Sequence, residues 1–166
     1  MTKTRVVLGL MLAAVVAVAC SSSSGPTTYA ITGGCSDVVV GFAGRAITLS
    51  GPCNLGAAGQ YTIGVSSLPV NLGACGPTAV PATNALWTQG TSVLSSTFTG
   101  NANIPCDGGV IDLTQPITLS GAFAYDGGTG PFVDASGIGA VADGGVTTTT
   151  GITFTASLPV SGSLSY

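Results

Sequence analysis

The chain has 166 residues, of which three are lysine or arginine and six are aspartate, and it contains no histidine and no glutamate. A formal net charge of −3 with only 5% charged residues excludes the basic surface that nucleic-acid binding requires. The lack of histidine excludes serine triads and histidine-based metal centres, so neither a bound metal nor a cofactor is expected.

Residues 1–19 have the composition of a secretory signal peptide. Lys3 and Arg5 form a short basic segment, and an uncharged apolar run follows from residue 6 to residue 19. This run is shorter than the roughly 20 apolar residues that span a membrane, and small residues end it as they do at a cleavage site. We therefore expect export and removal of residues 1–19.

The segment Ala17-Val18-Ala19-Cys20 resembles the lipobox of bacterial lipoproteins. The resemblance implies that Cys20 is acylated and becomes the new amino terminus, so that its lipid chains anchor the protein in a membrane. Ser21 is similar to the residue that sends such lipoproteins to the outer membrane of a bacterium with two membranes. The alternative is plain cleavage, with Cys20 as a bystander. Residues 20–28 are expected to form a flexible tether.

The four remaining cysteines are expected to form two disulfides, because an exported protein folds in an oxidising compartment. Four cysteines allow three pairings. The segment from Cys35 to Cys53 is symmetric about Gly44 and resembles a hairpin, which favours pairing Cys35 with Cys53 and leaves Cys75 to pair with Cys106. A metal site is the alternative, but no CxxC spacing accompanies these thiols.

A hairpin centred on Gly44 also predicts which side chains share a face. Val39 would lie opposite Leu49, and Gly41 opposite Ile47, on the side of the two sulfurs, because side chains alternate along a strand.

Two long runs alternate between apolar and polar residues, as half-buried strands do. In the run from Ile152 to Tyr166 the even positions are apolar or glycine, and in the run from Ile111 to Tyr125 the odd positions are mostly apolar. Pro159 and Pro116 lie on the polar sides, so each run is expected to be bent, bulged or divided into two strands. Shorter predicted strands are 28–32, 60–66 and 92–99.

Asp-Gly-Gly occurs at residues 107–109, 126–128 and 143–145. Asp-Gly favours the tight turns of β-hairpins, so each copy is predicted to join two antiparallel strands. Calcium loops are the alternative, although the spacing of known calcium motifs is absent. Residues 75–91 show no periodicity and are predicted to form a long surface loop, with Trp87 folded onto the core or, alternatively, exposed to stack on a ligand.

These patterns predict an all-β fold, with residues 29–166 forming one small antiparallel β-barrel of about eight strands. A two-sheet β-sandwich is the alternative. No segment after residue 19 has a helical period over three turns.

The sequence from Tyr125 to Gly137 contains Gly127, Gly128, Gly130 and Phe132 in a GGTGPF arrangement. It resembles the GGTGRF-type motif of small exported bacterial β-proteins and, more distantly, of dirigent and allene oxide cyclase-like barrels. The resemblance implies an eight-stranded barrel with a central cavity. The cyclase uses a glutamate, which this chain lacks, so no catalytic residue is carried over. We expect the four residues to form a structural turn in which Phe132 buries the corner.

Three functional hypotheses remain. The first is a lipid-anchored, non-catalytic protein of the cell envelope that binds a small apolar ligand in its interior, or an envelope glycan or protein. The second is a structural or adhesive surface lipoprotein with a filled core. The third is an enzyme that uses an aspartate of raised pKa inside the barrel, such as Asp112 or Asp134, or a cyclase-like activity that mainly shapes its substrate. Oligomeric state is not indicated by the sequence.

Overall fold

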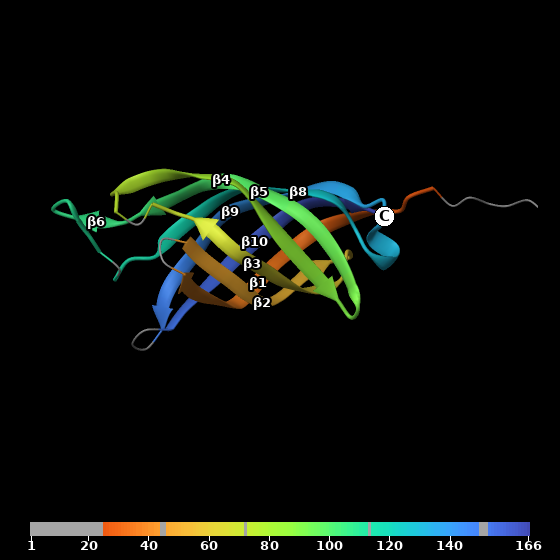
Figure 1. Ribbon diagram of the computed structural model, residues 1–166, viewed down its shortest axis with the longest axis horizontal. Helices are drawn as coiled ribbons and strands as arrows, with labels where there is room; N and C mark the ends of the chain where they lie inside the picture. Colours follow the sequence, from red (N-terminus) through yellow and green to blue (C-terminus); the bar gives the residue numbers. More distant parts are fainter. Residues whose placement is uncertain (1–24, 44–45, 72, 113, 150–152) are drawn as a thin grey trace, which may run out of the picture.

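Runs of alternating apolar and small polar residues form long strands that close on themselves in the computed structural model (Figure 1). The structure describes residues 25–43, 46–71, 73–112, 114–149 and 153–166. These ranges contain ten strands: β1 (Thr28–Ala43), β2 (Ala46–Gly56), β3 (Gln60–Pro69), β4 (Gly76–Gln89), β5 (Ser92–Ile104), β6 (Cys106–Asp107), β7 (Val110–Ile111), β8 (Ile117–Gly128), β9 (Ser136–Thr149) and β10 (Thr153–Ser165).

Eight of these strands form one closed antiparallel barrel in the order β1-β10-β9-β8-β5-β4-β3-β2. Each barrel strand pairs with the barrel strand that follows it in the chain, so that β5 pairs with β8, and β10 returns to pair with β1. The short β6 and β7 form a separate hairpin between β5 and β8. The predicted all-β class and eight-stranded barrel are therefore confirmed, whereas the alternative sandwich is not formed.

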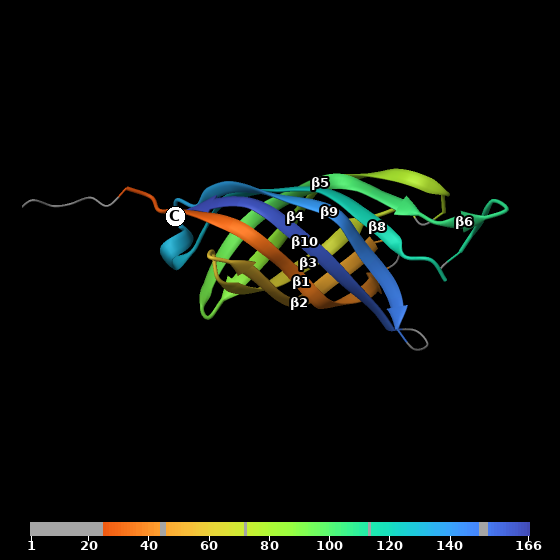
Figure 2. The same ribbon diagram turned by 180° about the vertical axis from the view of Figure 1, so that it is seen from behind.

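The two ends of the barrel differ. At one end, which we call the terminal pole, Thr27 and Tyr166 exchange two backbone hydrogen bonds of 3.0 and 3.1 Å, so the first and last described strands start and finish together. At the other end, which we call the hairpin pole, β6 and β7 project beyond the barrel body (Figures 1 and 2). Any tether preceding Thr27 therefore leaves the barrel at the end opposite the hairpin.

The long alternating runs lie where their patterns predict. Ala156, Leu158, Val160 and Leu164 of β10 point inward and are buried, and Pro159 lies within this strand without dividing it. The other run is divided: β7 ends at Ile111, and β8 begins directly after Pro116. In β8 the large apolar side chains at odd positions are again buried, and they are Ile117, Leu119, Phe123 and Tyr125.

Both predicted disulfides are present, Cys35 with Cys53 and Cys75 with Cys106. The predicted pairing of residues across the β1–β2 hairpin is wrong between the first disulfide and the turn, however. Asp37 has a positive φ of 55° and lies in a β-bulge that shifts the register by one residue between Cys35 and Val39. As a result Val40 lies opposite Leu49, Gly41 lies opposite Thr48, and Val39 is 57% exposed.

Only one of the three Asp-Gly-Gly segments forms a hairpin turn. Residues 107–109 join β6 to β7, with positive φ at Gly108 and Gly109. Residues 143–145 instead lie inside β9, where Asp143 has φ 53° and belongs to a bulge opposite β10. Residues 126–128 form the end of β8. The prediction of turns is wrong at these two places, because the same backbone freedom that permits a turn also permits a bulge.

The predicted loop at residues 75–91 is wrong, since most of it is β4. Its period-two pattern is interrupted by the bulge at Pro81 and Ala82, both of which are exposed. Beyond the bulge the alternation is regular, with Ala85 and Trp87 buried. Trp87 is thus part of the core, as one of the two predicted placements required.

Candidate functional site

The interior of the barrel contains a continuous series of aromatic rings. It starts at the terminal pole, where Tyr29 stacks on Tyr166 with ring centroids 4.9 Å apart, and Phe132 meets Tyr166 edge-on at 4.9 Å. It then passes through Tyr61 to Trp87, which packs edge-on against Phe123 at 4.9 Å. The eight members of the series are Tyr29, Tyr166, Phe132, Tyr61, Trp87, Tyr125, Phe123 and Phe98.

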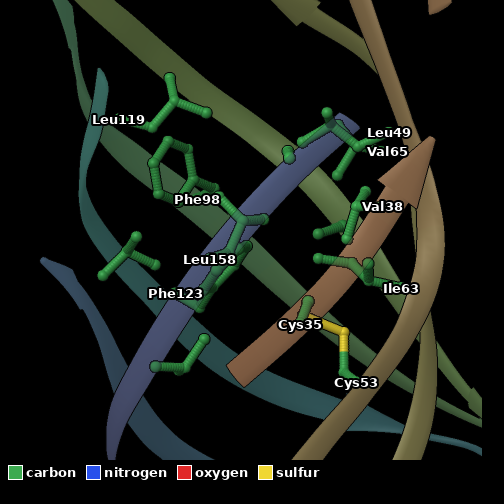
Figure 3. Packing of buried hydrophobic residues seen from close by; sticks show 14 of the residues in the cluster. Cys35, Val38, Leu49, Cys53, Ile63, Val65, Phe98, Leu119, Phe123 and Leu158 are labelled. Atoms are coloured by element: carbon green, nitrogen blue, oxygen red, sulfur yellow. A yellow bond between two sulfur atoms is a disulfide. The ribbon is translucent and has the colours of Figure 1, made fainter. Parts of the chain in front are cut away.

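Towards the hairpin pole, aliphatic side chains fill the interior together with Phe98 and Phe123 (Figure 3). The space left between them is about 10 Å³, close to the minimum that one water molecule needs. Pockets for small ligands have volumes of roughly 300–1,000 Å³. The residues that line this small cavity are Leu49, Val65, Leu68, Phe98, Leu119, Phe123, Val141 and Leu158. The part of the core that these described residues line is therefore filled by their own side chains.

The GGTGPF segment lies at the terminal pole. Gly127 and Gly130 have φ of 99° and 63°, and a short 3₁₀ turn, η1 (Gly130–Phe132), follows β8. Phe132 has no exposed surface and packs between Tyr61 and Tyr166. Gly128 lies against the backbone of β5, where an added Cβ would be 2.0 Å from the carbonyl oxygen of Val93. The segment thus closes one end of the barrel with an aromatic side chain.

Substituting Gly128 by alanine is expected to destabilise the barrel by about 2 kcal/mol or more, because the new methyl group meets backbone that has to move. Gly64→Ala is the matched control, since the nearest atom to a Cβ there is 4.0 Å away, and its effect should stay within about 0.5 kcal/mol. Thermal unfolding of the two variants measures the difference. Equal melting temperatures for the two would contradict the assigned contact.

The two predicted candidates for a catalytic aspartate, Asp112 and Asp134, do not lie inside the barrel. Asp134 is exposed. Asp112 lies in the turn between β7 and β8, where it accepts hydrogen bonds from the Thr114 hydroxyl and, at 2.9 Å, from the Thr114 backbone N–H. The Thr114 hydroxyl, and then its N–H, lower the pKa of Asp112, which is the opposite of what a buried general acid needs.

Two tyrosine hydroxyls are buried in the aromatic series. Tyr61 donates a hydrogen bond of 2.8 Å to the carbonyl oxygen of Ala58. The Tyr125 hydroxyl has no hydrogen-bond partner among the described residues and faces Gly139, where an added Cβ would lie 2.7 Å from its oxygen. Burial raises the pKa of both tyrosines above the usual range, with Tyr166 adding to the effect at Tyr61. Both phenols therefore stay neutral in the folded barrel.

No cluster of three or more cysteine or aspartate side chains that could hold a metal ion occurs among the described residues. None of the helices in that part of the chain is long and apolar enough to cross a membrane. The predicted lipidation site, Cys20, and the signal segment 1–19 lie outside the described residues.

Comparison of the chain with protein-family models, with curated protein sequences and with solved structures found no match. The barrel fold and the residues that line it are therefore the basis for inferring the function.

Proposed function

We propose that the protein is a lipid-anchored component of the bacterial cell envelope whose barrel has a structural or adhesive role and no catalytic one. The observation that carries this proposal is the filled interior, in which about 10 Å³ remains free. A carrier of an apolar molecule would need a cavity larger by more than an order of magnitude. The outer surface is then the part of the barrel that meets partners.

Export is supported by the two disulfides, which are compatible with an exported protein. The proposed anchor is Cys20, on the basis of its lipobox-like context. Six residues lie between Cys20 and Thr27, and the resulting seven Cα–Cα steps span about 25 Å in a fully extended chain. Acylation of Cys20 would therefore hold the terminal pole near the membrane and direct the hairpin pole away from it.

The test is the intact mass of protein extracted with detergent from its own envelope. The wild type should be heavier than the polypeptide 20–166 by the mass of its acyl chains, whereas Cys20→Ser should carry none and should leave the membrane fraction once its signal is removed. Ser24→Ala, four residues away in the same segment, is the matched control and should remain acylated.

Two results would contradict the proposal. A wild-type mass equal to that of the unmodified polypeptide would rule out the lipid anchor. A small molecule retained in native mass spectrometry would rule out the filled core, because the described interior has no space for one.

A further inference from the structure

Strands β3 and β4 are paired at one end only. Their ladder consists of Thr62 with Thr88, Ile63 with Trp87 and Gly64 with Leu86. On its other side β3 remains paired with β2 as far as Pro69, and β4 remains paired with β5 back to Gly76. The two edges that face each other, 65–69 of β3 and 76–85 of β4, therefore have no ladder between them in the described chain. We call this opening, which faces the hairpin pole, the fork.

Bulges in the two strands explain why they separate. In β3, Ser66 and Ser67 lie opposite the single residue Thr48 of β2. In β4, Pro81 and Ala82 lie opposite the single residue Thr99 of β5. A bulge bends its strand and increases the local twist. The β3 bulge begins two residues beyond the last β3–β4 pair, Gly64 with Leu86, and the β4 bulge lies four residues beyond it, so both strands bend in the stretch where their ladder does not continue.

Prolines keep the fork from closing. Pro69 lies at the end of β3, and Pro77 and Pro81 lie in the unpaired part of β4. A proline has no N–H to donate to a neighbouring strand. One backbone acceptor in this region is satisfied by a side chain instead, since the Thr83 hydroxyl donates 2.9 Å to the carbonyl oxygen of Pro81. No ladder pair joins the two edges in the part of the chain that the structure describes.

Open grooves occur at both ends of the fork. A groove of about 700 Å³ is lined by β2 and by the paired part of β3 and β4, and it extends to Ser66 and Asn84, where the strands part. A second, of about 340 Å³, lies between the end of β3 and the start of β4. None of the residues lining either groove is charged, and Leu86 is 49% exposed.

We propose that the fork binds an extended, uncharged segment of a partner protein, which adds as a strand along the β3 edge 65–68. Backbone donors and acceptors repeated at the spacing of a strand match another extended polypeptide backbone. The β3 edge carries N–H groups up to Pro69, whereas prolines interrupt the β4 edge. The uncharged lining favours an uncharged segment, and Leu86 supplies an apolar contact beside it.

This proposal is separate from the lipid anchor. The tether leaves from the terminal pole, while the fork opens towards the hairpin pole (Figure 2). A non-acylated protein would therefore still bind the segment, and failure of either proposal would not affect the other.

The experiment uses the full disulfide-bonded chain and a phage-displayed library of linear peptides as the probe. Uncharged peptides should be enriched, and the tightest of them should bind Ser66→Arg at least tenfold more weakly, because the new side chain occupies the groove. Ser120→Arg, an exposed position on the outer face of β8, is the matched control and should bind as the wild type does. Asn84→Arg gives a second test from the β4 side should Ser66→Arg unfold.

Hydrogen exchange then locates the bound peptide. Amides 65–68 should exchange more slowly with peptide present, and those of β9 should not change. Equal binding to wild type and both fork variants, or protection confined to other strands, would overturn the proposal. Protection of the same amides through concentration-dependent self-association would also overturn it, because the occupant would then be a second copy of this chain.

Discussion

Replacing Trp87 by alanine is expected to lower the free energy of unfolding by about 3–5 kcal/mol, the range for large aromatic side chains in cores. Trp87 has no exposed surface and contacts Phe123 and Tyr125 edge-on at 4.9 and 5.9 Å. Its removal would leave a cavity at the centre of the aromatic series, because a barrel wall held by ladders on both sides relaxes little. This loss is comparable to the total stability of a small domain.

A polar effect adds to the lost packing. The indole N–H of Trp87 donates a hydrogen bond of 2.8 Å to the Ser96 hydroxyl, which in turn donates to the carbonyl oxygen of Ala85 at 3.3 Å. Ser96 is only 2% exposed, so truncation leaves its oxygen without this donor in a dry environment. Trp87→Phe, which keeps an aromatic ring but removes the N–H, should therefore fall between the wild type and Trp87→Ala.

Urea denaturation with both disulfides intact measures these differences. Leu86→Ala is the control. Leu86 is the neighbour of Trp87 in the chain, but its side chain points outward and is 49% exposed, so the substitution should change the free energy of unfolding by no more than about 0.5 kcal/mol. If Trp87→Ala and Leu86→Ala were equally stable, the assignment of Trp87 to the core would be wrong.

The sequence was sufficient for the parts of the fold that depend on local pattern. Strand alternation marks β8 and β10 because every second residue of these strands enters the core. The spacing about Gly44 identifies the Cys35–Cys53 pair because the bulge at Asp37, which lies between the turn and the disulfide, adds one residue to β1 and so brings Cys35 opposite Cys53.

Bulges account for what the sequence did not reveal. The extra residue at Asp37 reverses the facing of Val39, and the one at Pro81 and Ala82 hides the period of β4. A one-residue shift moves every following side chain to the other face, and no residue type marks such a shift reliably. The fork involves one bulge in each of two neighbouring strands, so it follows from tertiary pairing. Three prolines near unpaired edges, Pro69, Pro77 and Pro81, were the available signal.

Whether the barrel is hollow also lay beyond the sequence. Inward residues such as Ala156 permit a cavity, but its volume depends on how side chains from different strands interdigitate. Here Phe98, Phe123 and Leu119 line, together with Leu49 and Val65, a space of only about 10 Å³. The choice between a carrier and a filled barrel is therefore decided by packing.

Stability is expected to fall steeply above about pH 10, the ordinary pKa of tyrosine. Burial raises the pKa of Tyr61 and Tyr125 in the folded state, so the unfolded chain loses their protons first. The stabilisation is fully present below the unfolded pKa and is lost as pH rises above it, by at most about 1.4 kcal/mol per pH unit for Tyr125 and by less for Tyr61, which is the less deeply buried of the two and is screened by solvent. The chain contains no histidine, and Cys35, Cys53, Cys75 and Cys106 are in disulfides, so neither histidine nor these cysteines contribute to this pH dependence.

Two tyrosine variants separate ionisation from hydrogen bonding. Tyr125→Phe removes a buried hydroxyl without a described partner, so it should stabilise the protein by about 1 kcal/mol at neutral pH. Tyr61→Phe removes the hydrogen bond to Ala58 and should destabilise it by a similar amount. Each should reduce the alkaline slope, because each removes one of the two phenols, and Tyr125→Phe should reduce it more because Tyr125 is the more deeply buried. Urea denaturation at a series of pH values measures both the free energy of unfolding at neutral pH and its slope at alkaline pH. A free energy of unfolding that stays constant above about pH 10 would show that these hydroxyls are accessible to water in the folded barrel.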